Sequence, residues 1–124
     1  VYTKDHNAFN ASCLAVLNVA RDSMAAAGYS PATRVFEAAG AGACLITDAW
    51  EGLEVFLEPG REVLVAASGD EVASLLDGLD PARCRALGRA ARARVLAEHT
   101  YDRRAELVER LLSGRALSHG EVTL

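Results

Sequence analysis

The sequence has 124 residues, of which 51% are hydrophobic and 24% charged, and this composition is ordinary for one soluble globular domain. Its net charge of −4 disfavours a nucleic-acid partner, and its apolar runs are far too short to span a membrane. Its three cysteines and three histidines have no metal-ligand spacing, so we expect reduced thiols, no bound metal and a cytoplasmic location.

The first third of the chain predicts one strand followed by one helix. Residues 15–19 are mostly apolar and include two valines, as a short buried strand does. A loop rich in small residues is expected over 25–29. Ser30 then fits a helix N-cap and Pro31 the first helical position, which predicts a helix over 31–39.

The rest of the chain continues this alternation. Apolar runs at 43–47 and 62–66 predict two further strands, with a short helical turn at 52–57 between them. Three helices are expected after the last strand: one after the capping box Ser68–Glu71, one over 81–98 with Asp80 as N-cap, and one beginning near Thr100.

Strands that alternate with helices form parallel βαβ units. The chain therefore predicts an α/β fold with a three-layer, Rossmann-like parallel sheet and flanking helices, as a single domain over 1–124. Three strands make a thin sheet, and the first residue is Val instead of Met. We therefore expect a truncated domain whose exposed sheet edge is available for a homodimer contact.

The strongest candidate binding residues lie around the start of the helix after the first strand. Free N–H groups and the helix dipole favour an anion there, and Thr33 and Arg34 add a hydroxyl and a guanidinium suited to a diphosphate. Glu37, one turn later, can accept two hydrogen bonds from ribose hydroxyls. Ser30 lies beside this terminus, and Asn18 ends the first strand at the same crevice. The alternative is that Arg34 and Glu37 form only a solvated ion pair.

Weaker candidates each have a structural alternative. His6 is near a segment end and could approach a phosphate. Trp50 could stack on a base or sugar, although a single Trp in a loop is more often a packing anchor. The arginines of 81–98 cover the exposed side of that helix, as in an ordinary solvated face, without the aromatic residues of a nucleic-acid site.

Four motifs occur in the order and spacing of a known family, and the similarity extends from about Leu17 to Leu112. They are Arg34-x-Phe36-Glu37-Ala38-Ala39-x-x-Gly42, Gly52-Leu53-Glu54-x-Phe56-x-Glu58-Pro59-Gly60-Arg61-Glu62, Arg85-x-x-Gly88-x-x-Ala91-Arg92-x-Arg94-Val95 and Glu98-His99-Thr100-Tyr101-x-x-Arg104. With them the chain resembles the C-terminal domain of bacterial CgeB-like glycosyltransferases. That family is similar to the retaining family-four enzymes of the GT-B fold (glycosyl transferases group 1).

The resemblance implies a hexosyltransferase-like enzyme in which this chain is part of the C-terminal, nucleotide-sugar-binding domain. The donor is expected to be a UDP-sugar or another NDP-sugar, with no metal or other cofactor. An N-terminal acceptor domain, missing from the chain, would complete the site, so the isolated fragment is expected to be inactive.

The resemblance also assigns residues. Related enzymes carry a Glu-x7-Glu motif whose second Glu holds the ribose, and Glu37 matches it. Tyr29 stands at the position of the first Glu, so the donor-sugar contact of that residue is not carried over. This difference favours the alternative function, a non-catalytic α/β binding or assembly module derived from the same fold.

Overall fold

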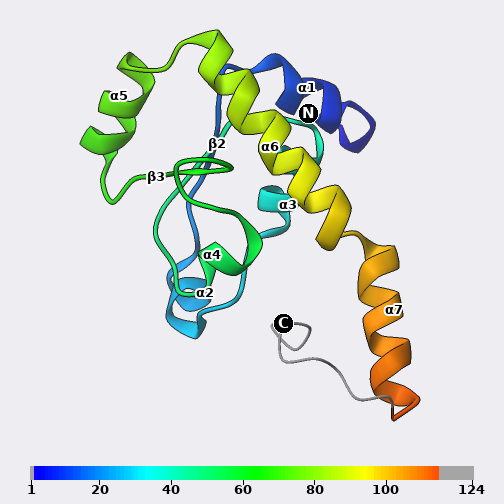
Figure 1. The fold of residues 1–124 in the computed structure, drawn as a ribbon. Coiled ribbons are helices and arrows are strands. Elements are labelled where there is room, and N and C mark those ends of the chain that lie inside the picture. The colour runs from blue at the N-terminus through cyan, green and yellow to red at the C-terminus, as the bar shows by residue number, and fades with distance from the viewer. Residues whose placement is uncertain (1, 115–124) are drawn as a thin grey trace.

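Three short parallel strands lie at the centre of the fold in the computed structural model, which describes residues 2–114 (Figure 1). They are β1 (Val16–Asn18), β2 (Leu45–Thr47) and β3 (Leu64–Val65), hydrogen-bonded in the order β1-β2-β3. Leu17 lies opposite Ile46 in the register of β1 and β2. Each strand falls inside its predicted run, so the predicted α/β fold with a parallel sheet is confirmed.

Helices connect the strands and continue after them. They are a short 3-10 helix η1 (Thr3–Asp5), α1 (His6–Ser12), α2 (Asp22–Ala27), α3 (Thr33–Gly40), α4 (Leu53–Phe56), α5 (Gly69–Asp77), α6 (Pro81–Glu98) and α7 (Tyr101–Leu112). α7 continues from the end of α6 and projects away from the strands (Figure 1). None of the helices within 2–114 is long and apolar enough to cross a membrane.

Each face of the sheet is covered by its own apolar cluster, because neighbouring residues of a strand point to opposite faces. Leu45 packs with residues of α3, α4 and the second half of α6. Ile46 and Leu64 pack with Cys84 and Leu87 from the first half of α6, and α5 lies against the same cluster. The long helix α6 therefore contributes to both clusters.

β1 is one of the two edge strands of the described sheet, and apolar side chains in it and directly after it are exposed. Leu17 is 47% exposed although its register partner Ile46 is buried, and Val19 is 66% exposed. The apolar surface predicted beside the first strand is therefore present. Its use in a homodimer stays a prediction.

The predicted N-caps Ser68 and Asp80 are confirmed, and the last helix begins at Tyr101, near Thr100 as predicted, with Thr100 as its N-cap. Asp80 Oδ1 accepts hydrogen bonds from the N–H groups of Ala82 and Arg83 at 2.7 and 2.9 Å. These bonds hold the pKa of Asp80 below its usual value, because they stabilise the carboxylate. The side chains of Ser68 and Thr100 each accept from the N–H of the third residue of the helix that follows.

The prediction was wrong at the start of α3. This helix begins at Thr33 with Ala32 as its N-cap, so Ser30 is not the N-cap and Pro31 is not the first helical residue. A tertiary contact explains the difference. The N–H of Tyr29 donates to a carbonyl oxygen of the loop after β2 at 2.7 Å, and the chain then reaches α3 through a non-helical segment.

The prediction was also wrong for the loop expected over 25–29. α2 covers Asp22–Ala27 and ends at Gly28, whose φ is 63°. Small residues suggested a loop, but alanine has the highest helix propensity, and three alanines complete this helix.

The three cysteines are free, and two of them are buried. Cys44 and Cys84 lie in the cluster beneath Ile46, where burial, followed by the neighbouring Cys84, raises the pKa of the Cys44 thiol to about 12. Cys44 therefore behaves as a small apolar core residue at neutral pH, and Cys84 packs in the same cluster.

Candidate functional site

A polar network joins the carboxyl ends of β1 and β2. Asn18 Nδ2 donates to Thr47 Oγ1 at 3.0 Å, and that hydroxyl donates to Asp48 Oδ1 at 3.2 Å. Both oxygens of Asp48 accept from the N–H of Ala20, at 3.0 and 3.1 Å. Asn18 is 2% exposed and Thr47 fully buried, so the Asn18 amide links the two strands.

These strand ends border a cleft of about 290 Å³ that extends to Ser68 at the start of α5. Asn18 and Asp48 line it. The structure therefore places Asn18 at the carboxyl ends of the strands, as predicted. Asn18 does not line either of the two clefts that border Glu37.

The loops after β1 and β2 are held together by Tyr29 and Gly52. Tyr29 has a φ of 46°, a left-handed conformation that is uncommon for a residue with a side chain. Its N–H bonds to the carbonyl oxygen of Glu51. Its ring lies against Gly52, where an added Cβ would overlap it. This contact positions the chain that leads into α3.

α3 starts on the side of the sheet where ligands bind in parallel α/β folds, because it follows β1 and runs back toward the beginning of β2. No side chain of residues 2–114 caps this terminus. Thr33 and Arg34 occupy the first two helical positions and are exposed, and Glu37 is exposed one turn later. The N–H groups of the first helical turn are oriented toward any anion placed there.

Glu37 borders two clefts, one on each side of α3. The first, of about 440 Å³, lies between α1, β1 and α3 and is lined by His6, Phe9 and Arg34 among others. The second, of about 500 Å³, lies between α3 and the beginning of α7 and includes Thr33. The structure thus brings Arg34 and His6 to one side of Glu37 and Thr33 to the other. Ser30, which is half-buried, lines neither cleft.

The second cleft also contains residues that the sequence analysis did not assign to the site, although they belong to one of the family motifs. They are His99, Tyr101 and Arg104, from the end of α6 and the first turn of α7. They lie more than sixty positions after Glu37 in the chain, and no local pattern predicts that α7 starts beside α3.

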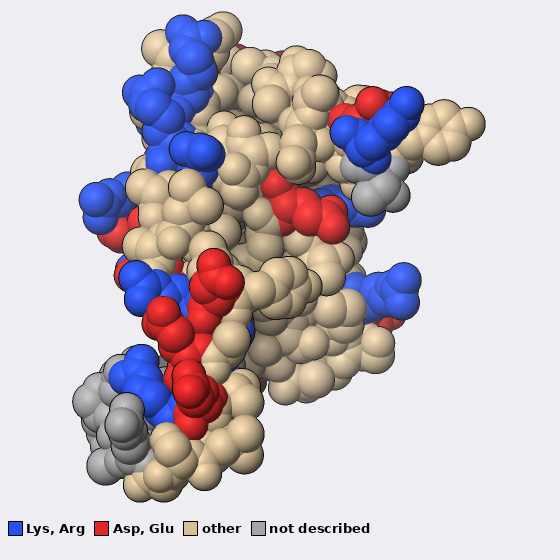
Figure 2. Space-filling model, turned by 90° about the vertical axis from the view of Figure 1, so that its right-hand side faces the viewer, with Lys and Arg blue, Asp and Glu red and all other residues tan. Residues whose placement is uncertain are grey.

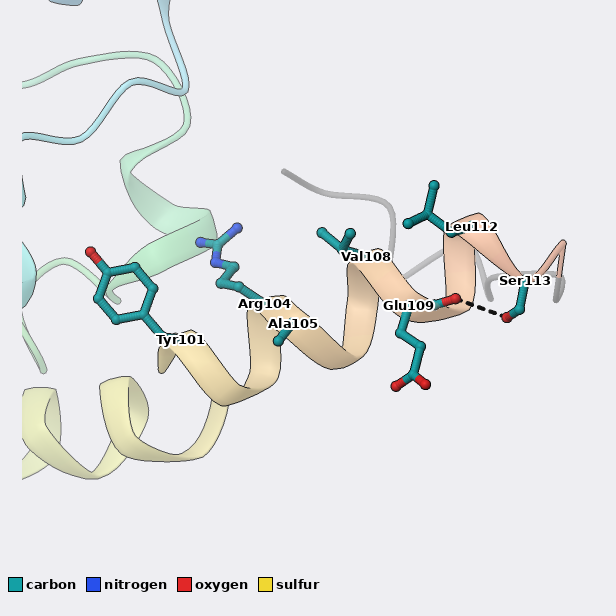
Figure 3. Close-up of a pocket in the computed structure, with 7 residues that line it drawn as sticks. All are labelled: Tyr101, Arg104, Ala105, Val108, Glu109, Leu112 and Ser113. Carbon is teal, nitrogen blue, oxygen red and sulfur yellow. Dashed lines mark hydrogen bonds between the residues drawn. The ribbon is translucent and has the colours of Figure 1, made fainter.

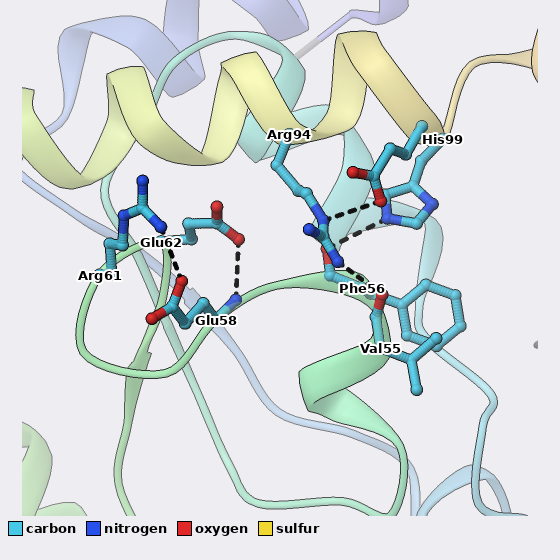
Figure 4. Close-up of polar contacts among 8 residues, drawn as sticks. Val55, Phe56, Glu58, Arg61, Glu62, Arg94 and His99 are labelled. Atoms are coloured by element: carbon cyan, nitrogen blue, oxygen red, sulfur yellow. Dashed lines mark hydrogen bonds and ion pairs between the residues drawn. The ribbon is translucent and has the colours of Figure 1, made fainter. Parts of the chain in front are cut away.

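His99, which lines this cleft, connects the end of α6 to α4 (Figure 4). Its Nε2 lies 3.1 Å from the Phe56 carbonyl oxygen, so this nitrogen carries the proton and donates it. Its ring also packs against Phe36 and Phe56, with centroids 5.8 and 5.6 Å apart. Burial, and then the charge of Arg104, lower the pKa of His99 and favour the neutral ring.

Two other predicted features have structural roles. Trp50 is 8% exposed and packs against Phe56 at a centroid distance of 5.8 Å, so it is a packing anchor. The Glu58–Glu62 motif forms a turn before β3, in which the buried Glu62 carboxylate accepts from the Glu58 N–H at 2.8 Å and Arg61 pairs with Glu58 (Figure 4).

The arginines of α6 form the solvated face that was predicted. Figure 2 shows basic side chains gathered at the upper left of the molecule, at the height of α6 in Figure 1. Arg92 donates to the Gly40 carbonyl oxygen at the end of α3, and Arg94 pairs with Glu98 at 3.1 Å.

Residues 1–110 match the model of a protein family described as glycosyl transferase-like. No curated protein and no solved structure matches the chain. The parallel sheet agrees with the fold expected from the sequence motifs. Because the match covers most of the sequence, the chain belongs to the glycosyl transferase-like family.

Proposed function

We propose that the chain is the donor-binding part of a glycosyltransferase, which holds a nucleotide-sugar while the sugar passes to an acceptor. Membership of the glycosyl transferase-like family supports sugar transfer. The observation that carries the more specific proposal is the position of Glu37. Its carboxylate is exposed between two clefts, one turn after the uncapped start of α3, and has no hydrogen bond or ion pair within 2–114.

The start of α3 supplies the chemistry that a departing nucleoside diphosphate requires. Negative charge develops on the diphosphate as the bond to the sugar breaks. The free N–H groups of the first turn, the helix dipole and the Arg34 guanidinium stabilise that charge. The helix terminus and Arg34 thus stabilise the departing diphosphate, and a metal ion has no part in this role.

The remaining predicted residues support this arrangement in different ways. Thr33 offers its hydroxyl beside the diphosphate, and Ser30 offers a second one from the segment that precedes the helix. The Glu37 carboxylate accepts hydrogen bonds from the ribose diol. Asn18 acts through Thr47, because its amide holds together the strand ends from which the binding loops depart.

The four sequence motifs support a CgeB-like hexosyltransferase in which a separate acceptor domain completes the site. In this reading the donor is a UDP-sugar or another NDP-sugar. The Tyr29 ring packs on Gly52 and so has a structural role in the loop. Because position 29 has no acid, the contacts to the donor sugar come from other residues.

Calorimetric titration of the 124-residue chain with UDP, GDP, ADP and CDP tests the proposal. We expect at least one of them to bind, and Glu37→Gln to weaken that binding by roughly ten- to hundredfold, because it removes a charged acceptor. Arg34→Ala should also weaken binding, and its effect should shrink as salt increases. Asp77→Asn on α5 is the matched control, since Asp77 is also an exposed acid on a helix. If no nucleotide binds, the proposal is wrong.

The exposed apolar residues of β1 favour one alternative, a non-catalytic binding or assembly module. In that case the chain binds no nucleotide and Leu17 and Val19 are covered by a second copy. Sedimentation analysis distinguishes the two functions when it is combined with the titration. A dimer that Leu17→Asp dissociates, in a chain without nucleotide affinity, supports the module.

A further inference from the structure

We infer that the cleft between α3 and the first turn of α7 is the base-binding end of the nucleotide site, in which the Tyr101 ring stacks on the base and Arg104 donates hydrogen bonds to its carbonyl oxygens. This inference rests on the proposed function and deepens it. It names two further binding residues and the class of base that they select.

The two walls of this cleft come from separate helices. Thr33, Phe36 and Glu37 of α3 form one wall, and Tyr101 and Arg104 of α7 form the other. Tyr101 and Arg104 are three positions apart and leave α7 on the same side, toward the rest of the domain (Figure 3). The volume, about 500 Å³, lies within the range of small-molecule sites.

Three of the side chains around this cleft, those of Glu37, Tyr101 and Arg104, are not used by the fold. The Tyr101 side chain is 92% exposed, so its aromatic face contributes little to the core. Arg104 is half-buried, and its guanidinium forms no hydrogen bond or ion pair within the described part of the chain. Glu37, opposite, has no such partner there either. The cleft therefore has one group for each part of a nucleoside. The carboxylate suits the ribose diol, the guanidinium suits the acceptor atoms of the base, and the open aromatic face suits its flat ring.

The cleft is continuous with the proposed diphosphate position. Thr33 is the first residue of α3 and also lines the cleft, and Glu37 follows one turn later, about 6 Å along the helix axis. A nucleoside diphosphate can therefore place its phosphates at Thr33, its ribose at Glu37 and its base against Tyr101. Because Arg104 only donates hydrogen bonds, it favours bases that have carbonyl oxygens (uracil, cytosine and guanine) over adenine, which has none.

The other cleft beside Glu37 provides a matched control. Phe9 borders that cleft and is 51% exposed, so it offers an alternative stacking surface. Removal of either ring should leave the fold intact, because neither belongs to the two apolar clusters. Melting temperatures of Tyr101→Ala and Phe9→Ala check this assumption.

Calorimetric titration with UDP, with ADP and with inorganic pyrophosphate tests the inference. We expect Tyr101→Ala to weaken UDP binding by about five- to hundredfold, the usual effect of losing one stacked aromatic ring. Tyr101→Phe should bind like the wild type, and Phe9→Ala should have no effect. Pyrophosphate affinity should be the same with and without the Tyr101 ring. Arg104→Gln should reduce the preference for UDP over ADP.

The possible failures have different meanings. If UDP binds and Glu37→Gln weakens it while Tyr101→Ala does not, the inference is wrong and the proposed function remains. If Phe9→Ala weakens UDP binding instead, the base lies in the cleft beside α1. If the wild type binds none of the nucleotides, the proposed function is wrong as well.

Discussion

The carbonyl oxygen of Gly42 lies directly against Gly88, with no space for a side chain between them. Gly42 follows the end of α3 with a φ of 76° and donates its N–H to the Ala39 carbonyl oxygen, while the N–H of Ala43 bonds to the carbonyl oxygen of Ala38. This is the Schellman pattern, which requires a left-handed residue at that point. Gly88 allows α6 to pack closely on this turn, so the two glycines join the candidate binding helix to the longest helix of the fold.

Gly88→Ala should destabilise the protein by about 1–3 kcal/mol, because the new methyl group forces the Gly42 turn and α6 apart. Urea denaturation followed by circular dichroism measures the change. Gly69→Ala is the matched control, since an added Cβ there meets no atom within 4 Å. Equal midpoints for Gly88→Ala and the wild type would show that α6 does not pack closely on Gly42.

Gly52→Ala should disturb the two loops at the carboxyl end of the sheet. Gly52 has a φ of 89°, and a Cβ there would overlap the Tyr29 ring, so the substitution combines backbone strain with a steric clash. Gly60→Ala shares the positive φ but has open space around it. We expect Gly52→Ala to lose at least about 1 kcal/mol more than Gly60→Ala.

A double-mutant cycle separates the two causes. Replacing Tyr29 with Ala in the Gly52→Ala background removes the clash and should recover part of the lost stability. If the two substitutions are simply additive, the ring does not pack on Gly52.

Asp48→Ala should loosen the loop that follows β1. It removes both acceptors of the Ala20 N–H and the partner of the Thr47 hydroxyl, at a cost of about 1–3 kcal/mol. Hydrogen exchange should therefore accelerate at the Ala20 amide more than at amides of α5. Asp77→Ala is the control, because Asp77 is an exposed acid outside this network. Unchanged exchange at Ala20 would contradict the assigned hydrogen bonds.

Local signals predicted much of the fold. The apolar runs located all three strands, and Asp80, Ser68 and Thr100 marked helix starts because a cap depends only on the residues next to it. The start of α3 could not be predicted in this way. Ser30 and Pro31 have the pattern of a helix start, but the contact between Tyr29 and the loop after β2 delays the helix to Thr33.

The candidate site was predicted only in part, for the same reason. Thr33, Arg34 and Glu37 follow from the helix position, since helical spacing places them near one another. Tyr101 and Arg104 join them only because α6 packs in both apolar clusters and ends beside Phe36, which depends on packing along its whole length. Asn18 was placed correctly at a strand end, but its partner Thr47 lies 29 residues away and could not be anticipated.

Stability should fall as the pH decreases below the ordinary pKa of histidine, about 6.5. Burial lowers the pKa of His99 in the folded state, so the unfolded chain takes up a proton at a higher pH than the folded one. The contribution of His99 is complete when the ring is neutral in both states, and it is lost progressively as the pH falls from the unfolded pKa toward the folded one. His99→Gln keeps a donor for the Phe56 carbonyl oxygen without titrating, so its urea midpoint should change less between pH 7.5 and pH 5.

Arg104→Gln should raise the pKa of His99 toward the ordinary value, because it removes the second cause of the shift. NMR titration of the His99 ring measures this pKa in the wild type and in Arg104→Gln, and a pKa at or above 6.5 in the folded wild type would contradict the burial of the ring.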